Sequence, residues 1–64
     1  MVSQVRAELS SITSQVEELM DRVVKIGDEY RNDPDSQFVT DCNSAERSLM
    51  TAIRSLERAK KQVS

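Results

Sequence analysis

The sequence is poor in the residues that carry chemistry, because its 64 positions include no histidine, no tryptophan, one cysteine and one glycine. Without histidine, the commonest general base and metal ligand is missing. Cys42 has no second cysteine with which to form an intrachain disulfide, and a lone Gly27 does not make a glycine-rich phosphate loop. We therefore predict a protein that is not an enzyme and that has no catalytic residue, metal site or cofactor.

Long apolar runs and a basic excess are also missing. No stretch approaches the ~18 apolar residues that would span a bilayer. The first turns carry Arg6 and Glu8, which is unlike a signal peptide. The net charge of −2 disfavours nucleic acid as a partner, although it does not exclude it. We expect a cytoplasmic protein with a reduced Cys42 and no membrane segment.

What the sequence does contain is a heptad pattern that runs twice. Apolar residues recur at alternating steps of three and four from Val2 to Tyr30 and again from Phe38 to Val63, as in helices that pack along one seam. The two series mirror each other about Pro34. The mirrored pairs are Tyr30 and Phe38, Ile26 and Cys42, Val23 and Ala45, Leu19 and Leu49, Val16 and Ala52, Ile12 and Leu56, Leu9 and Ala59, and Val5 and Val63. The predicted fold is therefore all-α, an antiparallel two-helix hairpin with coiled-coil packing.

The hairpin is predicted to be a single domain over residues 1–64, with a helix over about 2–31, a turn at about 32–33 and a helix over about 34–63. Asn32 suits the left-handed conformation that often ends a helix. Asp33 is the expected N-cap of the second helix, and Pro34 suits its first position.

A second apolar strip lies beside the seam. Its members are Met20, Val24, Gly27, Val39, Met50 and Ile53. A lone hairpin of this length has little core, and without a disulfide or metal it is expected to oligomerise. A second copy would cover the strip in a dimeric four-helix bundle, or the helix of a protein partner would bind it, since methionine suits adaptable surfaces. Simple filling of the core is the preferred interpretation of the methionines, and a groove for a target helix is the alternative.

Basic side chains recur on the outer face of the second helix, at Arg47, Arg54, Arg58 and Lys61. They either contact phosphates or form a solvated face that interacts with the helix dipole. In length, two-residue turn and alternation of small and large seam residues, the chain resembles the Rop-type hairpin, a family of RNA-binding four-helix-bundle dimers. We hypothesise a small interaction or regulatory module that self-associates and binds a protein partner through helix packing. The alternative is Rop-like RNA binding through the basic face.

Overall fold

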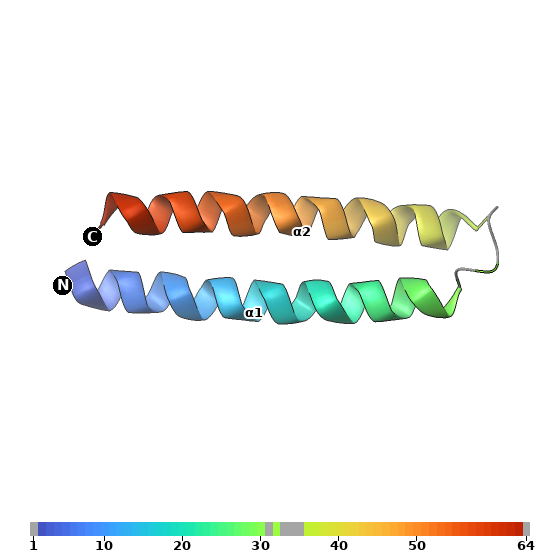
Figure 1. The fold of residues 1–64 in the computed structure, drawn as a ribbon, viewed down its shortest axis with the longest axis horizontal. Coiled ribbons are helices and arrows are strands. Elements are labelled where there is room, and N and C mark those ends of the chain that lie inside the picture. The colour runs from blue at the N-terminus through green and yellow to red at the C-terminus, as the bar shows by residue number, and fades with distance from the viewer. Residues whose placement is uncertain (1, 31, 33–35, 64) are drawn as a thin grey trace.

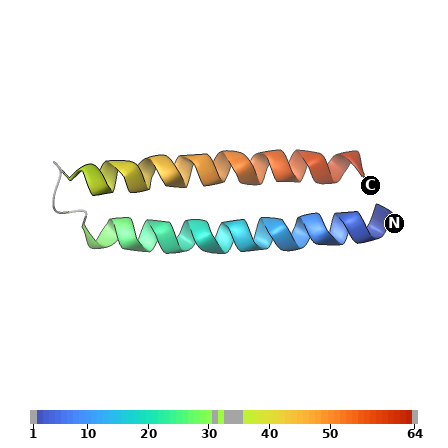
Figure 2. The same cartoon turned by 180° about the vertical axis from the view of Figure 1, so that it is seen from behind.

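The computed structural model describes residues 2–30, 32 and 36–63, which form two helices, α1 (Val2–Glu29) and α2 (Gln37–Gln62). The helices lie side by side and antiparallel, with both termini at one end and the connection at the other (Figure 1, and from behind in Figure 2). The molecule is a rod of 49 × 14 × 10 Å. The predicted two-helix hairpin is confirmed.

The connection between the helices differs in detail from the prediction. The cap of α2 is Ser36, which has an extended backbone (φ −72°, ψ 121°) and whose hydroxyl oxygen accepts the Val39 N–H at 3.3 Å. Because of this cap α2 begins at Gln37, later than predicted, while Asp33 and Pro34 lie outside the described residues. The left-handed conformation predicted for Asn32 depends on Arg31, which lies outside the described residues, so it stays a prediction. The Tyr30 N–H donates to the Gly27 carbonyl at 3.1 Å, tightening the last turn of α1.

Replacing Ser36 with alanine should lower the free energy of unfolding by about 1 kcal/mol, because the Val39 N–H loses its acceptor. Urea unfolding followed by circular dichroism measures the change. Ser48→Ala is the matched control, since Ser48 is exposed within α2 and alanine there favours the helix. Equal stability of the Ser36 variant and the parent would contradict the assignment of the cap.

The layer next to the turn agrees with the predicted pairing. The rings of Tyr30 and Phe38 meet edge to face, with centroids 5.0 Å apart and an interplanar angle of 71°. Such an arrangement places the positive edge of one ring on the negative face of the other. It ties the end of α1 to the start of α2 and sets the register of the hairpin at this end.

Elsewhere the contact between the helices uses only half of the predicted seam of α1. The row of Leu9, Val16 and Val23 is half-buried, as expected. The other predicted row is 42–47 % exposed and consists of Val5, Ile12, Leu19 and Ile26. Its place against α2 is taken by the row of Thr13, Met20 and Gly27, which is one position further along the chain.

On the second helix, too, one of the two predicted rows is half-buried and most of the other is exposed. Its predicted row of Cys42, Leu49, Leu56 and Val63 is half-buried. Phe38, Ala45 and Ala52, which were predicted to share the seam, are exposed. The half-buried positions in their place are Val39, Glu46, Ile53 and Lys60. The large side chains of Val5, Ile12, Leu19 and Ile26, which were predicted to fill the seam, thus remain nearly half exposed at the edge of the contact within one chain.

The reason is that the apolar stripe of α1 is wider than one neighbouring helix can cover. Three adjacent rows of α1 are apolar or small, and a single antiparallel partner covers about two of them. No apolar side chain among the described residues is fully buried, and Thr13 is the one described residue that is. The radius of gyration is 14.9 Å, against about 11 Å for a compact domain of this length. The single chain thus has a helical framework without an enclosed core.

Candidate interaction surface

One side of the hairpin is apolar along its whole length, and we call it the open face. Its α1 part is the large row, Val5, Ile12, Leu19 and Ile26. Residues seven apart lie two turns apart on the same side of a helix. The large row is therefore a continuous ridge that points neither at α2 nor directly away from it.

The α2 part of the open face is a row of small residues. Ala45, Ala52 and Ala59 follow Phe38 at steps of seven, and we call them the alanine row. Val24 and Asp28 of α1 and Val39 and Glu46 of α2 line one groove, so they lie on one side of the hairpin. The large row and the alanine row flank the contact on the other side of each helix, and they therefore lie together on the opposite side of the hairpin. A ridge of large side chains thus runs beside a shallow strip of alanines, and neither row contains a charged residue.

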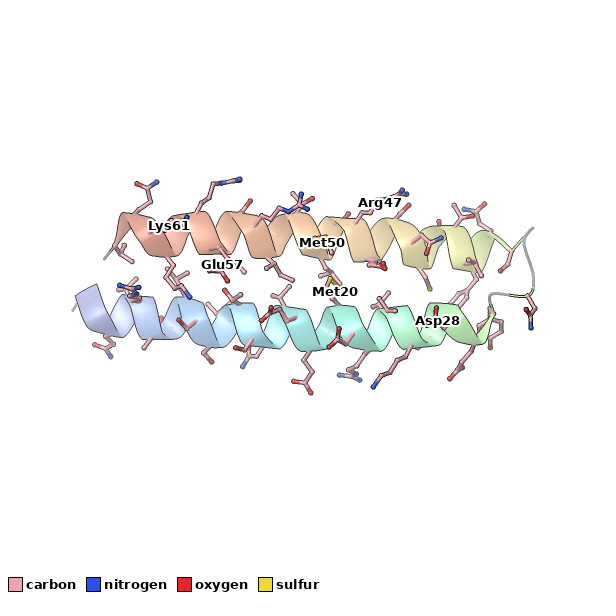
Figure 3. All side chains as sticks on the ribbon, in the orientation of Figure 1. Met20, Asp28, Arg47, Met50, Glu57 and Lys61 are labelled. Carbon is pink, nitrogen blue, oxygen red and sulfur yellow. The ribbon has the colours of Figure 1, made fainter. Side chains whose placement is uncertain are left out.

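The six residues predicted as an interface lie on the opposite side of the contact between the helices. Met20, Val24, Gly27, Val39 and Ile53 are half-buried, so they already contribute to the packing of α1 on α2. Met50 is 41 % exposed. Met20 and Met50 lie near one another at mid-length of the two helices (Figure 3). The six residues therefore lie on one side of the hairpin, but five of them are already partly covered by the packing of α1 on α2.

A groove of about 330 Å³ opens on that side near the turn. It is lined by Val23, Val24, Gly27 and Asp28 of α1 and by Val39, Cys42, Asn43 and Glu46 of α2. A Cβ atom added at Gly27 would lie 3.3 Å from the Cβ of Cys42. Gly27 therefore allows a helix to approach closely, and that helix is α2 of the same chain.

Replacing Gly27 with valine should destabilise the hairpin by about 1–3 kcal/mol, because the branched side chain forces α2 away at Cys42. Alanine is the comparison. It gains about 1 kcal/mol of helix propensity and needs a shift of only a few tenths of an ångström, so we expect it to lie close to the parent. Thermal unfolding of the three proteins measures the order. A valine variant as stable as the alanine variant would contradict the close approach.

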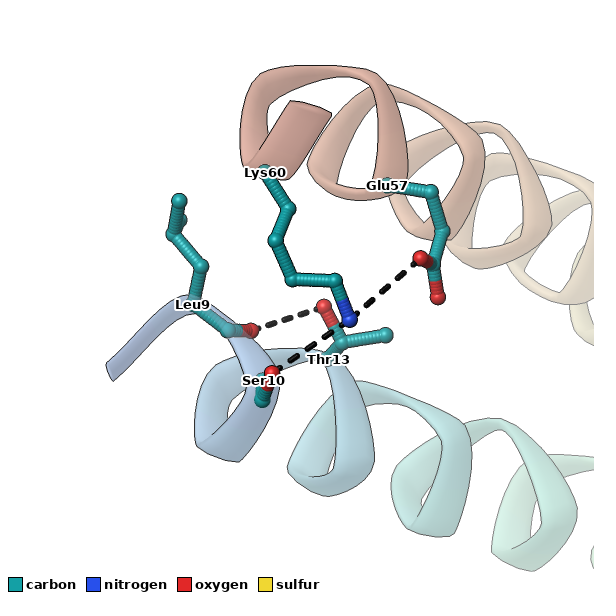
Figure 4. Close-up of polar contacts among 5 residues, drawn as sticks. All are labelled: Leu9, Ser10, Thr13, Glu57 and Lys60. Carbon is teal, nitrogen blue, oxygen red and sulfur yellow. Dashed lines mark hydrogen bonds and ion pairs between the residues drawn. The ribbon is translucent and has the colours of Figure 1, made fainter. Parts of the chain in front are cut away.

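A polar layer crosses the hairpin near its open end (Figure 4). The Lys60 Nζ of α2 donates to Ser10 Oγ of α1 at 3.3 Å and lies 3.6 Å from Glu57 Oε2. Beside it Thr13, only 3 % exposed, donates its hydroxyl to the Leu9 carbonyl at 2.8 Å. The prediction missed this layer, although Thr13, Met20 and Gly27 have the same seven-residue spacing as the large row.

The basic side chains keep their predicted place on the outside. Arg47, Arg54, Arg58 and Lys61 are all exposed, and Arg47 points away from α1 (Figure 3). The Arg58 guanidinium donates to Ser55 Oγ at 3.2 Å. A use of this row in RNA binding stays a prediction.

Little else in the described part of the chain suggests a binding site. Cys42 is a free, half-buried thiol, and no group of three or more acidic or cysteine side chains among the described residues could hold a metal ion. Neither described helix combines the length and the apolar character needed to cross a bilayer. In comparisons with known proteins, no family model, no curated protein and no solved structure matches the chain.

Proposed function

We propose that the chain is a non-enzymatic, cytoplasmic helical interaction module whose partner at the open face is a second copy of itself. The observation that carries the proposal is the amount of surface that one copy leaves in water. Its accessible surface is 5035 Å², whereas a compact monomer of 7.2 kDa exposes about 4,100 Å². The excess of about 900 Å² is close to what each partner contributes to a stable protein interface.

The chemistry of the open face supports a partner of the same kind. A two-fold interface uses one surface patch twice, so that patch must complement itself. The open face has a ridge of large residues beside a strip of alanines, and it carries no charge that a copy would leave unpaired. Two such faces together would give the four-helix bundle, with the outer charged side chains of both helices in water.

In this bundle the opposite side of each hairpin remains exposed. Met50 and the groove beside Gly27 lie there, and they are where we place the helix of a protein partner. The protein would then act as a small dimeric adaptor or regulator that recognises its target by helix packing.

Sedimentation equilibrium at micromolar concentration tests the self-association. We expect a species of twice the 7.2 kDa chain mass and a melting temperature that rises with protein concentration, because folding and association are linked. A monomer that unfolds at the same temperature at every concentration would refute the proposal.

Binding of RNA through the basic row is the competing function, and it makes a separate prediction. Binding of this kind weakens steeply with salt because condensed counterions are released. A mobility shift with mixed RNA at low salt, lost in the double variant Arg47→Glu and Arg54→Glu, would support it. A parent protein that shifts no RNA at low salt would remove it and leave the interaction module.

A further inference from the structure

We infer that two copies associate with their turns at the same end, so that α1 of each copy packs on α2 of the other. The inference rests on the proposed self-association through the open face. Two hairpins whose open faces meet can be related by a two-fold axis along the bundle or by one across it. The first puts α1 on the partner's α2, and the second puts α1 on α1 and α2 on α2 with the turns at opposite ends.

The sizes of the side chains favour the first arrangement. It places the large row of each copy on the alanine row of the other, and cores fill evenly when large residues face small ones. The second arrangement places large residues on large ones along one side and alanines on alanines along the other. The helices would then have to be far apart on one side and close on the other.

The register of the hairpin agrees with the first arrangement without any further adjustment. A two-fold axis along the bundle leaves every residue at its own height, so the levels within one hairpin are also the levels between copies. Gly27 lies beside Cys42, and Ser10 lies beside Lys60. At ~1.5 Å of rise per residue, these contacts bring three of the four large residues to within about 3 Å, along the axis, of an alanine of the other copy. The matched pairs are Ile26 with Ala45, Leu19 with Ala52, and Ile12 with Ala59.

The aromatic pair gives a second reason. Tyr30 and Phe38 are 51 % and 46 % exposed at the turn end. With the turns together, the four rings of the two copies meet and cover one another. With the turns apart, the two aromatic pairs lie at opposite ends of the bundle, so the rings of one copy cannot cover those of the other.

The charges of the helices give a third reason. From Val2 to Glu29, α1 has six acidic and three basic residues, a net charge of −3. From Gln37 to Gln62, α2 has three acidic and five basic residues, a net charge of +2. Placing α1 beside the partner's α2 brings opposite net charges together, whereas the alternative brings like charges together.

Energy transfer between labelled copies tests the orientation. Thr40 and Gln62 are exposed, lie near opposite ends of α2, and are each replaced by cysteine in a Cys42→Ala background. Donor-labelled Thr40→Cys protein is mixed either with acceptor-labelled Thr40→Cys or with acceptor-labelled Gln62→Cys. The two sites are separated by about 33 Å along the helix. We expect more efficient transfer in the first mixture, because both turns lie at the same end.

The outcomes separate the orientation from the self-association. More efficient transfer to the Gln62 acceptor would overturn the orientation and leave the dimer. No transfer in either mixture, together with a monomer mass in sedimentation, would overturn both. Donor-labelled Gln62→Cys with the Gln62 acceptor repeats the test at the other end and should match the first mixture, so the result does not depend on one variant folding normally.

Discussion

Replacing Leu19 with aspartate should turn the dimer into a monomer. Leu19 is the more exposed of the two central residues of the large row, 47 % accessible in one copy, and the proposed bundle buries it against the partner's alanine row. An unpaired carboxylate there loses its hydration without gaining a partner. The two-fold axis introduces two such carboxylates in each dimer. We expect Kd to rise by more than about a hundredfold, which corresponds to ~3 kcal/mol.

Sedimentation equilibrium measures this change, with circular dichroism to follow the helix content. Met50→Asp is the matched control, because Met50 is almost equally exposed but lies on the opposite side of the hairpin. It should leave the mass of the dimer unchanged. If Met50→Asp dissociates the dimer and Leu19→Asp does not, the self-association uses the strip of Met20, Val24 and Met50 in place of the open face.

Replacing Leu49 with alanine should have the second-largest effect, a loss of about 2–5 kcal/mol in the free energy of unfolding. Leu49 is half-buried between α1 and α2 at the middle of the hairpin, and the proposed bundle would enclose it further. Truncation removes apolar contacts between the helices and leaves a cavity that the surrounding side chains fill only in part.

Urea unfolding at a fixed protein concentration measures the loss at Leu49. Thr51→Ala is the control, because Thr51 is exposed on α2 and donates its hydroxyl only to the Arg47 carbonyl within the same helix. Its stability should stay within about 0.5 kcal/mol of the parent. A Leu49 variant as stable as this control would show that the centre of the hairpin is not a packed layer.

Predictions that depend on local pattern agree best with the structure. The heptad steps gave both helices, and the mirror about Pro34 gave the antiparallel hairpin with Tyr30 beside Phe38. The helix boundary at Ser36 was missed, because Asp33, Pro34, Asp35 and Ser36 offer several caps in a row. Choosing among adjacent caps depends on how the chain spans the gap between the packed helices.

The side of each helix that faces its neighbour could not be predicted in the same way. Leu9, Val16 and Val23 have an apolar or small row on either side, one through Ile12 and Leu19 and one through Met20 and Gly27. The alternating steps of three and four indicated the first row, because Ile12 and Leu19 continue the heptad pattern with Leu9 and Val16. The hairpin uses the second, where Gly27 lets α2 come close at Cys42 and Lys60 reaches Ser10.

The sequence by itself determined that this chain forms two amphipathic helices and folds back once, because periodicity and helix-breaking residues act over a few neighbouring positions. Only the tertiary structure decided which row each helix turns inward. One residue along a helix rotates the side chain by about 100°, so a choice between adjacent rows depends on the fit of both helices at once. That choice leaves the large row of α1 outside, where a second chain can cover it.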